Sequence, residues 1–444
     1  MSGTAIPRLP GGVPGLGHAL ALRRDPFGLL LRARAWGDVV EIGVGPRPVY
    51  VINSPRVIRQ ILVSDAAHYD KGSLFEKASA VLGNGVVTSS GEFHRQQRRL
   101  IHPAFQSTRI PLYAEVMTAL AEELSQAWQP GRHLRMDAEM HRLTITTAAR
   151  TLFSSRLADH AVTEIQHSLP VFLSTITARA LSPVPLLEKL PTPGNRRFAR
   201  ARQRMLRAVL SVIDDYRAVG GDQGDLLSML LAARDADSGR AMPREQVYDE
   251  AVTFMVAASE STATALSWAF HYLGNHRAVE ERVRREVRDC LGERAAARHG
   301  DLPRLARLRQ VLHEVLRLHP LALLPRRALQ DVEVDGRHYP RGTQFFISPH
   351  ALHRDRRHYA APADFDPDRW APDRAPHIDP ETYLPFGVGR HGCLGESFAW
   401  SSMTITLATL LNRFSFTPVP GHRIREVMAG TSRPCHLPMI VHPC

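Results

Sequence analysis

The sequence predicts a mainly α-helical protein with a minor β region. Apolar residues recur with a helical period through most of the region from Gln97 to Arg294. Within that region, Ala251–Tyr272 is apolar on nearly every face, which is typical of a buried central helix. Short runs rich in β-branched and aromatic residues occur on either side of the region. We therefore expect a helical body that carries small sheets.

The expected strands are short and are bounded by turn residues. Val39–Val44 and Val49–Ile52 flank a Gly-Pro turn and predict a hairpin. The proline-rich segment Leu181–Pro193 is expected to interrupt the helical region, and Asp225 to cap the helix that follows it. Further strands are expected near Val332–Val334, Thr343–Ile347, Phe414–Thr417 and Met439–Val441.

Length and composition favour one large soluble domain. The chain has 444 residues without a Pro/Gly/Ser-rich linker in its middle, so we expect a single domain over 1–444, with a Pro/Gly-rich N-terminal segment over 1–20. No stretch approaches the roughly 18 apolar residues of a membrane span, and the N-terminus lacks the apolar core of a signal peptide. The four cysteines contain no Cys-x-x-Cys pair. A cytoplasmic protein in a reducing compartment, without a membrane anchor, is the expectation.

The net charge of +12 comes almost entirely from arginine, because lysine occurs only at Lys71, Lys77 and Lys189. One interpretation is a basic face that docks an acidic electron-transfer protein. The simpler interpretation is the coding bias of a high-GC bacterial genome. Nucleic-acid binding is not expected, because the chain has neither a nucleic-acid-binding motif nor a clustered basic stripe.

Cys393 follows a glycine-rich loop with basic residues beside it, in the run Phe386–Gly395. The thiolate is the metal-binding form of cysteine, and nearby cations or a helix N-terminus lower the pKa of a thiol. Leu394–Trp400 can begin such a helix, and the glycines allow a flat ring to approach the backbone closely. For an isolated glycine-flanked cysteine, a buried structural role is the stronger alternative, because short motifs have many false matches.

The whole run resembles the haem-binding signature Phe-x-x-Gly-x-His/Arg-x-Cys-x-Gly of the cytochrome P450 family, the haem-thiolate monooxygenases. Four further motifs resemble that family in its order, over nearly the whole chain. The resemblance implies a triangular helical body with small β-sheets, and a haem between the central long helix and the helix after the Cys loop. It also implies haem b with Cys393 as proximal iron ligand, where thiolate donation favours O–O cleavage.

A step of small and polar residues, Ala257–Thr262, interrupts the apolar central helix. It resembles the family's Ala/Gly-Gly-x-Asp/Glu-Thr-Thr motif, in which an acid and an alcohol deliver protons to oxygen. This implies proton delivery by Glu260 and Ser261, with Thr262 sharing the role. Two positions depart from the motif: Ala258 replaces Gly, and serine replaces the first Thr and lacks the methyl group that fixes its rotamer. The alternative is a polar step that satisfies its own hydrogen bonds.

Glu314 and Arg317 lie three residues apart on one face of an apolar helix, which predicts a buried ion pair. The family pairs this motif with an arginine in a downstream Phe-x-Pro-x-Arg segment, here Phe365–Arg369. The resemblance therefore implies that Glu314, Arg317 and Arg369 form a structural triad that supports the haem loop. A surface salt bridge is the alternative, because most Glu-x-x-Arg pairs are of that kind.

The two haem propionates require charge-assisted hydrogen bonds where they leave an apolar pocket. The resemblance assigns this role to His94 and Arg98, four residues apart on one predicted helix, to His391 and to Arg326, with Arg327 as a neighbouring rival. A solvated basic helix face is the alternative around Arg98, and it is compatible with a redox-partner surface.

The resemblance also implies an apolar substrate pocket, although plain core packing is the alternative for each of its residues. No fixed charge can be placed in it, so a medium-sized apolar substrate, such as a terpenoid or another secondary metabolite, is expected. The residues expected to line it are Phe254, Ala257, Ala258, Leu323, Leu324 and Met428.

The function expected from the resemblance is a monooxygenase that inserts one oxygen atom from O2 into a hydrophobic small molecule. Electrons are expected from a ferredoxin and a ferredoxin reductase, since no flavin or nicotinamide domain is recognisable. Two alternatives stay open. One is a peroxide-using haem-thiolate oxygenase, which Ser261 keeps possible, and the other is a non-enzymatic haem sensor or carrier.

Overall fold

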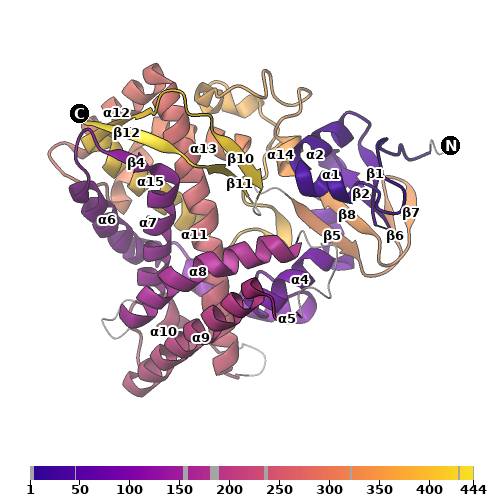
Figure 1. The fold of residues 1–444 in the computed structure, drawn as a ribbon, viewed down its shortest axis with the longest axis horizontal. Coiled ribbons are helices and arrows are strands. Elements are labelled where there is room, and N and C mark those ends of the chain that lie inside the picture. The colour runs from indigo at the N-terminus through magenta and orange to yellow at the C-terminus, as the bar shows by residue number, and fades with distance from the viewer. Residues whose placement is uncertain are drawn as a thin grey trace. The chain divides into compact units, whose positions relative to one another are not determined.

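The computed structural model describes residues 5–45, 47–153, 159–180, 190–234, 239–320, 323–428 and 431–443. Helices dominate and the sheets are small, which confirms the predicted mainly α-helical fold with a minor β region (Figure 1). Contacts divide the chain into two compact units. The first comprises Met1–Glu76, His313–Cys393 and Gly430–Ser432, and the second comprises Lys77–Leu312, Leu394–Ala429 and Arg433–Cys444.

The first unit is built on a five-stranded sheet in the order β1-β2-β8-β5-β3. The predicted hairpin is confirmed, because β1 and β2 pair antiparallel, whereas β8 pairs parallel to β2 from a remote part of the sequence. The strands of this unit are β1 (Val39–Val44), β2 (Arg47–Ile52), β3 (Tyr69–Asp70), β5 (Leu324–Ala328) and β8 (Gln344–Ile347), with the separate hairpin β6 (Val332–Val334) and β7 (Arg337–Tyr339).

Alternate residues of β1 pack on opposite faces of this sheet, as the period of a strand requires. Val40 and Ile42 join the cluster that includes Leu29 and Leu30 of α2, which lies beside the sheet in Figure 1. Val39 joins the cluster on the other face. The helices of this unit are α1 (Ala19–Arg24), α2 (Pro26–Arg34), α3 (Pro55–Arg59), the π-helix η1 (Gln60–Ser64), α14 (Pro349–Leu352) and the short 3₁₀ turns η2 (Ala66–His68), η7 (Pro367–Trp370), η8 (Ala375–His377), η9 (Pro380–Thr382) and η10 (Gly389–His391).

The second unit consists mainly of long helices. They are α5 (Gly91–Ile101), α6 (Ile110–Ala127), α7 (Met136–Leu152), α8 (Asp159–Ala180), α9 (Pro193–Val219), α10 (Leu226–Ala232), α11 (Arg244–Asn275), α12 (Arg277–Leu291) and α15 (Glu396–Arg413), with the 3₁₀ turns η3 (His102–Phe105) and η6 (His299–Arg304). Helices α4 (Ser73–Leu82) and α13 (Ala306–Leu318) run from one unit into the other along the chain. The strands are β4 (His133–Arg135), β9 (Phe414–Pro418) and β12 (Pro438–Pro443) in one sheet, and the pair β10 (Arg425–Met428) and β11 (Ser432–Cys435), of which Ser432 belongs to the first unit.

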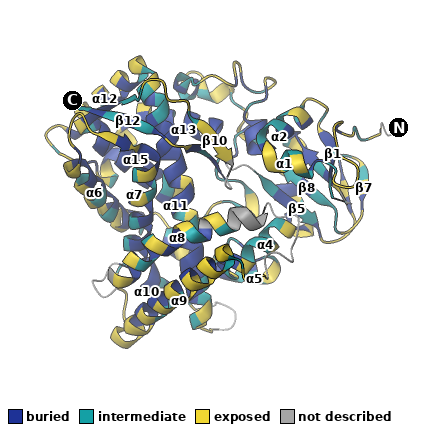
Figure 2. Cartoon of the chain, viewed as in Figure 1, coloured by how far each residue is buried: buried dark blue, intermediate teal, exposed yellow. Residues whose placement is uncertain are grey.

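Helix α11 is the central helix of the second unit. It contains the predicted segment Ala251–Tyr272 and is buried over much of its length (Figure 2). Helix α7 packs along it, and the Thr144 hydroxyl donates a hydrogen bond to the Ser259 carbonyl at 3.0 Å. This bond fixes α7 against the polar step of α11.

The other predicted features of the helical region are only partly described. Asp225 caps α10 as expected, because its Oδ1 accepts a hydrogen bond from the Ser228 N–H at 2.9 Å. Of the predicted break Leu181–Pro193, residues 181–189 lie outside the described part of the chain, and α9 begins at Pro193. Among the described residues, no helix is long and apolar enough to cross a bilayer.

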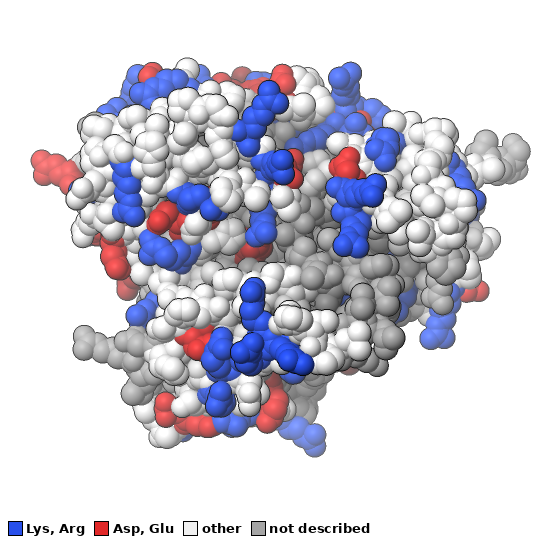
Figure 3. Space-filling model, in the orientation of Figure 1, with Lys and Arg blue, Asp and Glu red and all other residues white. Residues whose placement is uncertain are grey.

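Basic side chains are prominent on the surface face that Figure 3 shows. Helix α9 is amphipathic: Phe198, Ala201 and Met205 are buried, whereas the arginines between residues 196 and 207 are exposed. Basic side chains gather where α9 lies, and acidic ones are fewer on that face. This cluster of exposed arginines on α9 corrects the expectation that the chain has no clustered basic stripe.

Candidate functional site

Cys393 ends a tight, hydrogen-bonded loop in the first unit. Its N–H donates to the Phe386 carbonyl at 2.9 Å, and the Gly392 N–H donates to the Gly389 carbonyl at 2.9 Å. Cys393 is exposed, whereas Cys290 is buried and burial raises the pKa of its thiol. The side chain of Cys393 therefore lies outside the core, which argues against the buried structural role.

The helix after Cys393 begins at Glu396, two residues later than the earliest start that the sequence allows. Gly395 occupies its N-cap position. The loop before Cys393 is fixed by another glycine: Gly389 has a φ of +70°, and a Cβ built on it would overlap the Leu62 carbonyl oxygen of the π-helix η1. Only a residue without a side chain fits there without moving one of the two segments.

We expect Gly389→Ala to destabilise the protein more than Gly336→Ala does. Both glycines have a φ of +70°, but a Cβ on Gly336 meets nothing within 4 Å. The control carries only the backbone cost of about 1–2 kcal/mol. At Gly389 the overlap with Leu62 adds about 1–3 kcal/mol. Urea unfolding of the two variants checks this, and equal losses of stability would contradict the close packing of the loop.

Glu314 and Arg317 form a fully buried, bidentate ion pair on α13, in agreement with the predicted burial. Arg317 Nη2 lies 2.8 Å from Glu314 Oε1, and Arg317 Nε lies 2.8 Å from Glu314 Oε2. Both side chains are 0% exposed. Arg369 Nε lies 3.5 Å from the same carboxylate, and the Tyr359 ring lies against both guanidinium groups. The structure thus brings the three predicted residues together.

The triad is embedded in a larger network that the sequence did not predict. Arg317 also donates to the carbonyls of His353 and Pro362, at 2.7 and 2.8 Å. Glu314 accepts a further hydrogen bond from Trp370 Nε1 at 2.9 Å. The sequence offers one indication that Trp370 lies near Glu314: Trp370 directly follows Arg369, a predicted member of the triad.

His353 connects this network to the segment before the Cys loop. Its Nδ1 donates to the Arg317 carbonyl at 3.1 Å, and its Nε2 accepts from the Leu384 N–H at 2.8 Å. Burial lowers the pKa of His353 to about 3, so the ring is neutral and both nitrogens are bonded. Leu384 lies two residues before Phe386, so the network supports the start of the loop that ends at Cys393.

The two neighbouring arginines of β5 differ in their partners. Arg327 pairs with Asp70 at 2.5 Å and Glu76 at 2.6 Å, and the hydrogen bond to Asp70 raises its pKa above the ordinary value. Arg326 is 5% exposed, and among the described residues it donates one hydrogen bond, to the Pro325 carbonyl at 2.8 Å. Burial lowers the pKa of Arg326 to about 10. A buried cation needs an anionic partner, which favours Arg326 over Arg327 as an anion ligand.

The remaining predicted cations are divided between the units. His391 belongs to the first unit, where it ends η10 and is half-buried. His94 and Arg98 lie one turn apart on α5 in the second unit. His94 is buried and its Nδ1 donates to the Val86 carbonyl at 3.0 Å, which directs Nε2 away from that loop. Arg98 is half-buried.

The polar step of α11 presents one hydroxyl outward. Ser261 is exposed, and its Oγ donates to the Ala257 carbonyl one turn earlier at 2.8 Å. Thr262 is buried, and its hydroxyl makes no hydrogen bond with the described residues. Glu260 is 7% exposed and binds His141 of α7, with Nε2 and Oε2 3.0 Å apart. His141 is a partner that sequence reasoning missed.

The predicted pocket residues have mixed surroundings. Phe254 packs between Phe105 and Phe398, with ring centroids 5.9 and 5.6 Å apart, so it belongs to the core of the second unit. Ala257 on α11 is exposed and Ala258 half-buried. In the first unit, Leu323 and Leu324 are half-buried, and the side chain of Met428 lies outside the described part of the structure.

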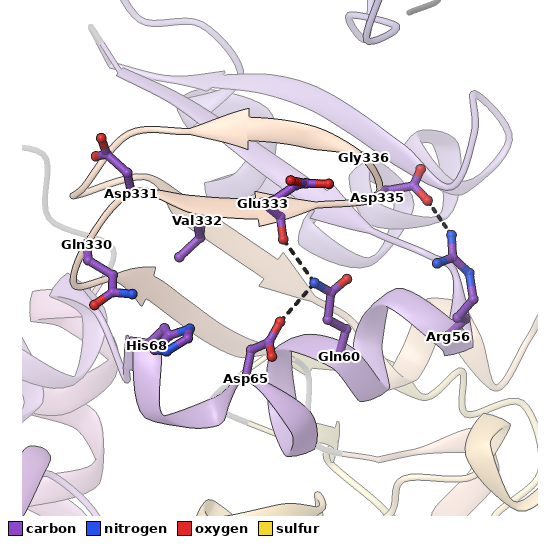
Figure 4. Close-up of a pocket in the computed structure, with 10 residues that line it drawn as sticks. All are labelled: Arg56, Gln60, Asp65, His68, Gln330, Asp331, Val332, Glu333, Asp335 and Gly336. Atoms are coloured by element: carbon purple, nitrogen blue, oxygen red, sulfur yellow. Dashed lines mark hydrogen bonds and ion pairs between the residues drawn. The ribbon is translucent and has the colours of Figure 1, made fainter. Parts of the chain in front are cut away.

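A hollow of about 470 Å³ in the first unit is polar and does not resemble the expected site (Figure 4). Gln60 Nε2 donates to Asp65 Oδ2 and to the Glu333 carbonyl, both at 2.9 Å, and Arg56 pairs with Asp335. These groups largely satisfy one another. Neither an apolar ring system nor a thiolate-bound metal fits such a lining.

Comparison with known proteins places this geometry in one family. A model of the cytochrome P450 family matches residues 7–437. A cyclooctatin synthase of Streptomyces melanosporofaciens is 43% identical, over 94% of this chain and 91% of its own length. A cyclooctat-9-en-7-ol 5-monooxygenase of the same organism is 40% identical, over 98% and 94%. A pentalenene oxygenase of Streptomyces avermitilis is 34% identical, over 97% and 95%.

Solved structures show the same fold. A cytochrome P450DA haem domain superimposes with a TM-score of 0.87 at 23% identity, over 99% of this chain and 98% of its own. A retinoic-acid-bound cyanobacterial CYP120A1 superimposes with a TM-score of 0.86 at 27% identity, over 99% and 100%. The resemblance stated from the sequence motifs is therefore confirmed over nearly the full length.

Proposed function

The chain belongs to the cytochrome P450 family of haem monooxygenases, and on this premise we propose that it oxygenates a terpenoid or a similar apolar secondary metabolite with electrons from a ferredoxin and its reductase. The observation that carries the substrate class is the near-full-length similarity to three Streptomyces proteins, two of which are named for oxygenating cyclooctat-9-en-7-ol and pentalenene. The small side chains of the exposed Ala257 and the half-buried Ala258 on α11 are compatible with an apolar molecule beside that helix.

The residues of the first unit suit a haem b. Cys393 offers an exposed sulfur at the end of a rigid loop, and Arg326 is a buried cation that has few partners of its own. The described residues contain no cluster of three or more His, Cys, Asp or Glu suited to a bare metal ion. A single cysteine thiolate suits a haem, because the porphyrin nitrogens already ligate the iron and the protein needs to add few ligands. The haem, when bound, supplies the oxygen-activating chemistry.

We assign the chain's own groups as follows. Cys393 would bind the haem iron, while Arg326, His391, His94 and Arg98 would bind the propionates. Ser261 moves protons at its Oγ, which the bond to the Ala257 carbonyl holds in one orientation. Glu260 supplies these protons from the adjacent helical position. Thr262 is buried, which favours Ser261 as the alcohol of the pair.

An exposed arginine in the Cys loop supports an acidic electron donor. Arg390 is exposed in the Cys loop, three residues before the sulfur. A ferredoxin that docks there with acidic side chains would gain association rate from the long-range attraction. The net charge of +12 would also raise the association rate with an acidic ferredoxin.

We expect cyclooctat-9-en-7-ol or pentalenene to shift the haem from low to high spin on titration. NADH-driven turnover with ferredoxin and reductase is then expected to give a product that contains one atom of ¹⁸O from labelled O2. A linear fatty acid of similar carbon number is the control and is expected to shift the spin state less. Turnover with peroxide but not with NADH would favour the peroxide-using alternative. Binding without turnover in either assay would favour the sensor or carrier.

A further inference from the structure

Glu260 is held from the side of α7 by a histidine. Its Oε2 lies 3.0 Å from His141 Nε2, and its Oε1 lies 3.9 Å from Arg433 Nη1 of β11. The Glu260 side chain is 9% exposed and that of His141 is 23% exposed. All three residues belong to the second unit. The histidine thus has more solvent contact than the carboxyl group that it binds.

The hydrogen bonds of His141 determine where its protons are. Nδ1 lies 2.9 Å from the Asp137 carbonyl, which can only accept, so Nδ1 carries a proton. In a neutral ring, Nε2 would then be an acceptor facing an acceptor oxygen of Glu260. The 3.0 Å contact is a hydrogen bond only if one further proton lies between the two atoms. The pair is therefore either imidazolium with carboxylate or imidazole with carboxylic acid.

The charges around the pair favour retention of this proton on the ring. Burial alone would lower the pKa of His141, but the hydrogen bond and the charge of Glu260, with the Asp137 carbonyl, raise it above 6.5 despite the opposing charge of Arg433. The Asp137 carboxylate is bound by Arg135 at 2.7 Å and by the Leu437 N–H at 3.0 Å. Hydrogen bonds from these two groups outweigh burial and lower the pKa of Asp137, so its carboxylate is paired with Arg135, and Asp137 acts on His141 through its backbone carbonyl.

We propose that His141 and Glu260 form a proton-sharing pair in which His141 positions Glu260 and reloads it with protons from the solvent. The proton on Nε2 passes to Glu260 Oε2, which leaves a neutral imidazole whose Nδ1–H still donates to the Asp137 carbonyl. Glu260 then gives this proton to the Ser261 hydroxyl on α11. His141 Nε2 takes another proton from solvent, which restores the imidazolium. This inference rests on the proposed role of Glu260 in proton delivery.

The pair itself can be tested without turnover, by ¹⁵N NMR of histidine-labelled protein. We expect His141 to show two protonated ring nitrogens at neutral pH and a pKa above 6.5. In Glu260→Gln the pKa of His141 is expected to fall, because the amide offers no charge and can donate to Nε2. An unchanged pKa in this variant would overturn the shared proton, whatever the enzyme oxygenates.

The role in proton delivery is tested by the fraction of NADH that appears as oxygenated product. In the wild type this fraction is expected to fall as the pH rises through the pKa of His141, because the shared proton is then lost. His141→Gln keeps a donor to Glu260 but cannot titrate, so we expect a lower fraction that is independent of pH in that range.

His167 provides a matched control. Its Nδ1 makes the same type of bond, to the Thr163 carbonyl one turn earlier at 2.8 Å, on an exposed face of α8. His167→Gln is expected to keep the wild-type fraction and pH profile. A wild-type profile in His141→Gln would overturn the reloading role even if the NMR result stands. An absence of product in every variant, including the wild type, would instead count against the proposed function.

Discussion

Cys393→Ala is expected to abolish the red-shifted Soret band that a thiolate-ligated haem gives when it is reduced and exposed to carbon monoxide. Oxygenation is expected to fall to background in the same variant. The reason is electronic: a thiolate ligand would donate density to the iron and favour O–O cleavage, which a neutral ligand such as the imidazole of His391 would not do to the same extent. The measurement is a difference spectrum on protein that has been shown by circular dichroism to be folded.

Cys435 provides the control for this experiment. It is also an exposed free cysteine, but it lies on β11 outside the Cys loop. Cys435→Ala is expected to keep both the band and the activity. Retention of the red-shifted band in Cys393→Ala would refute the assignment of the iron ligand, and loss of the band in both variants would point to damage from thiol replacement in general.

Local features of the fold were predictable, because they depend on short-range periodicity and capping. The central helix, the first hairpin and the Asp225 cap all follow from neighbouring residues. Pairing between remote segments was not predictable in this way. The parallel pairing of β2 with β8 joins strands nearly 300 residues apart, and no short-range signal records it.

The same distinction applies to the candidate site. The motif residues identified Glu260, but its partner His141 lies 119 residues earlier with no spacing signal. The choice between Arg326 and Arg327 depends on carboxylates at Asp70 and Glu76, which the sequence cannot place. Phe254 is apolar in either role, so only its packing against other aromatic rings shows that it lies in the core. The chemical role of a candidate residue was predictable from its type, whereas the residues that contact it could be identified only from the fold.

The buried charge network explains why Glu314 should be among the residues least tolerant of change. Its carboxylate satisfies Arg317 in a bidentate pair and accepts from the Trp370 indole, all away from water. Glu314→Gln keeps the shape but removes the charge, which leaves the Arg317 guanidinium buried without a counter-ion. Breaking such a pair costs about 3–5 kcal/mol, a large part of the roughly 5–15 kcal/mol that stabilises a typical domain.

Glu139 and Arg142 of α7 provide a matched comparison. They have the same order and spacing on a helix and a contact of 2.7 Å, but Arg142 is 62% exposed. Arg142→Ala is therefore expected to cost less than about 1 kcal/mol. Urea unfolding at neutral pH, followed by circular dichroism, measures both variants.

A double variant, Glu314→Gln with Arg317→Met, distinguishes charge from shape. The double variant removes the Arg317 cation that Glu314→Gln leaves without a counter-ion, whereas the Arg369 cation stays in both variants. The double variant is therefore expected to be more stable than Glu314→Gln alone, although the carbonyls of His353 and Pro362 then lose their donor. A Glu314→Gln loss no greater than that of Arg142→Ala would show that the network does not depend on this charge. A double variant less stable than Glu314→Gln would show that the hydrogen bonds of Arg317 to the carbonyls, rather than its ion pair, hold the segment before the Cys loop in place.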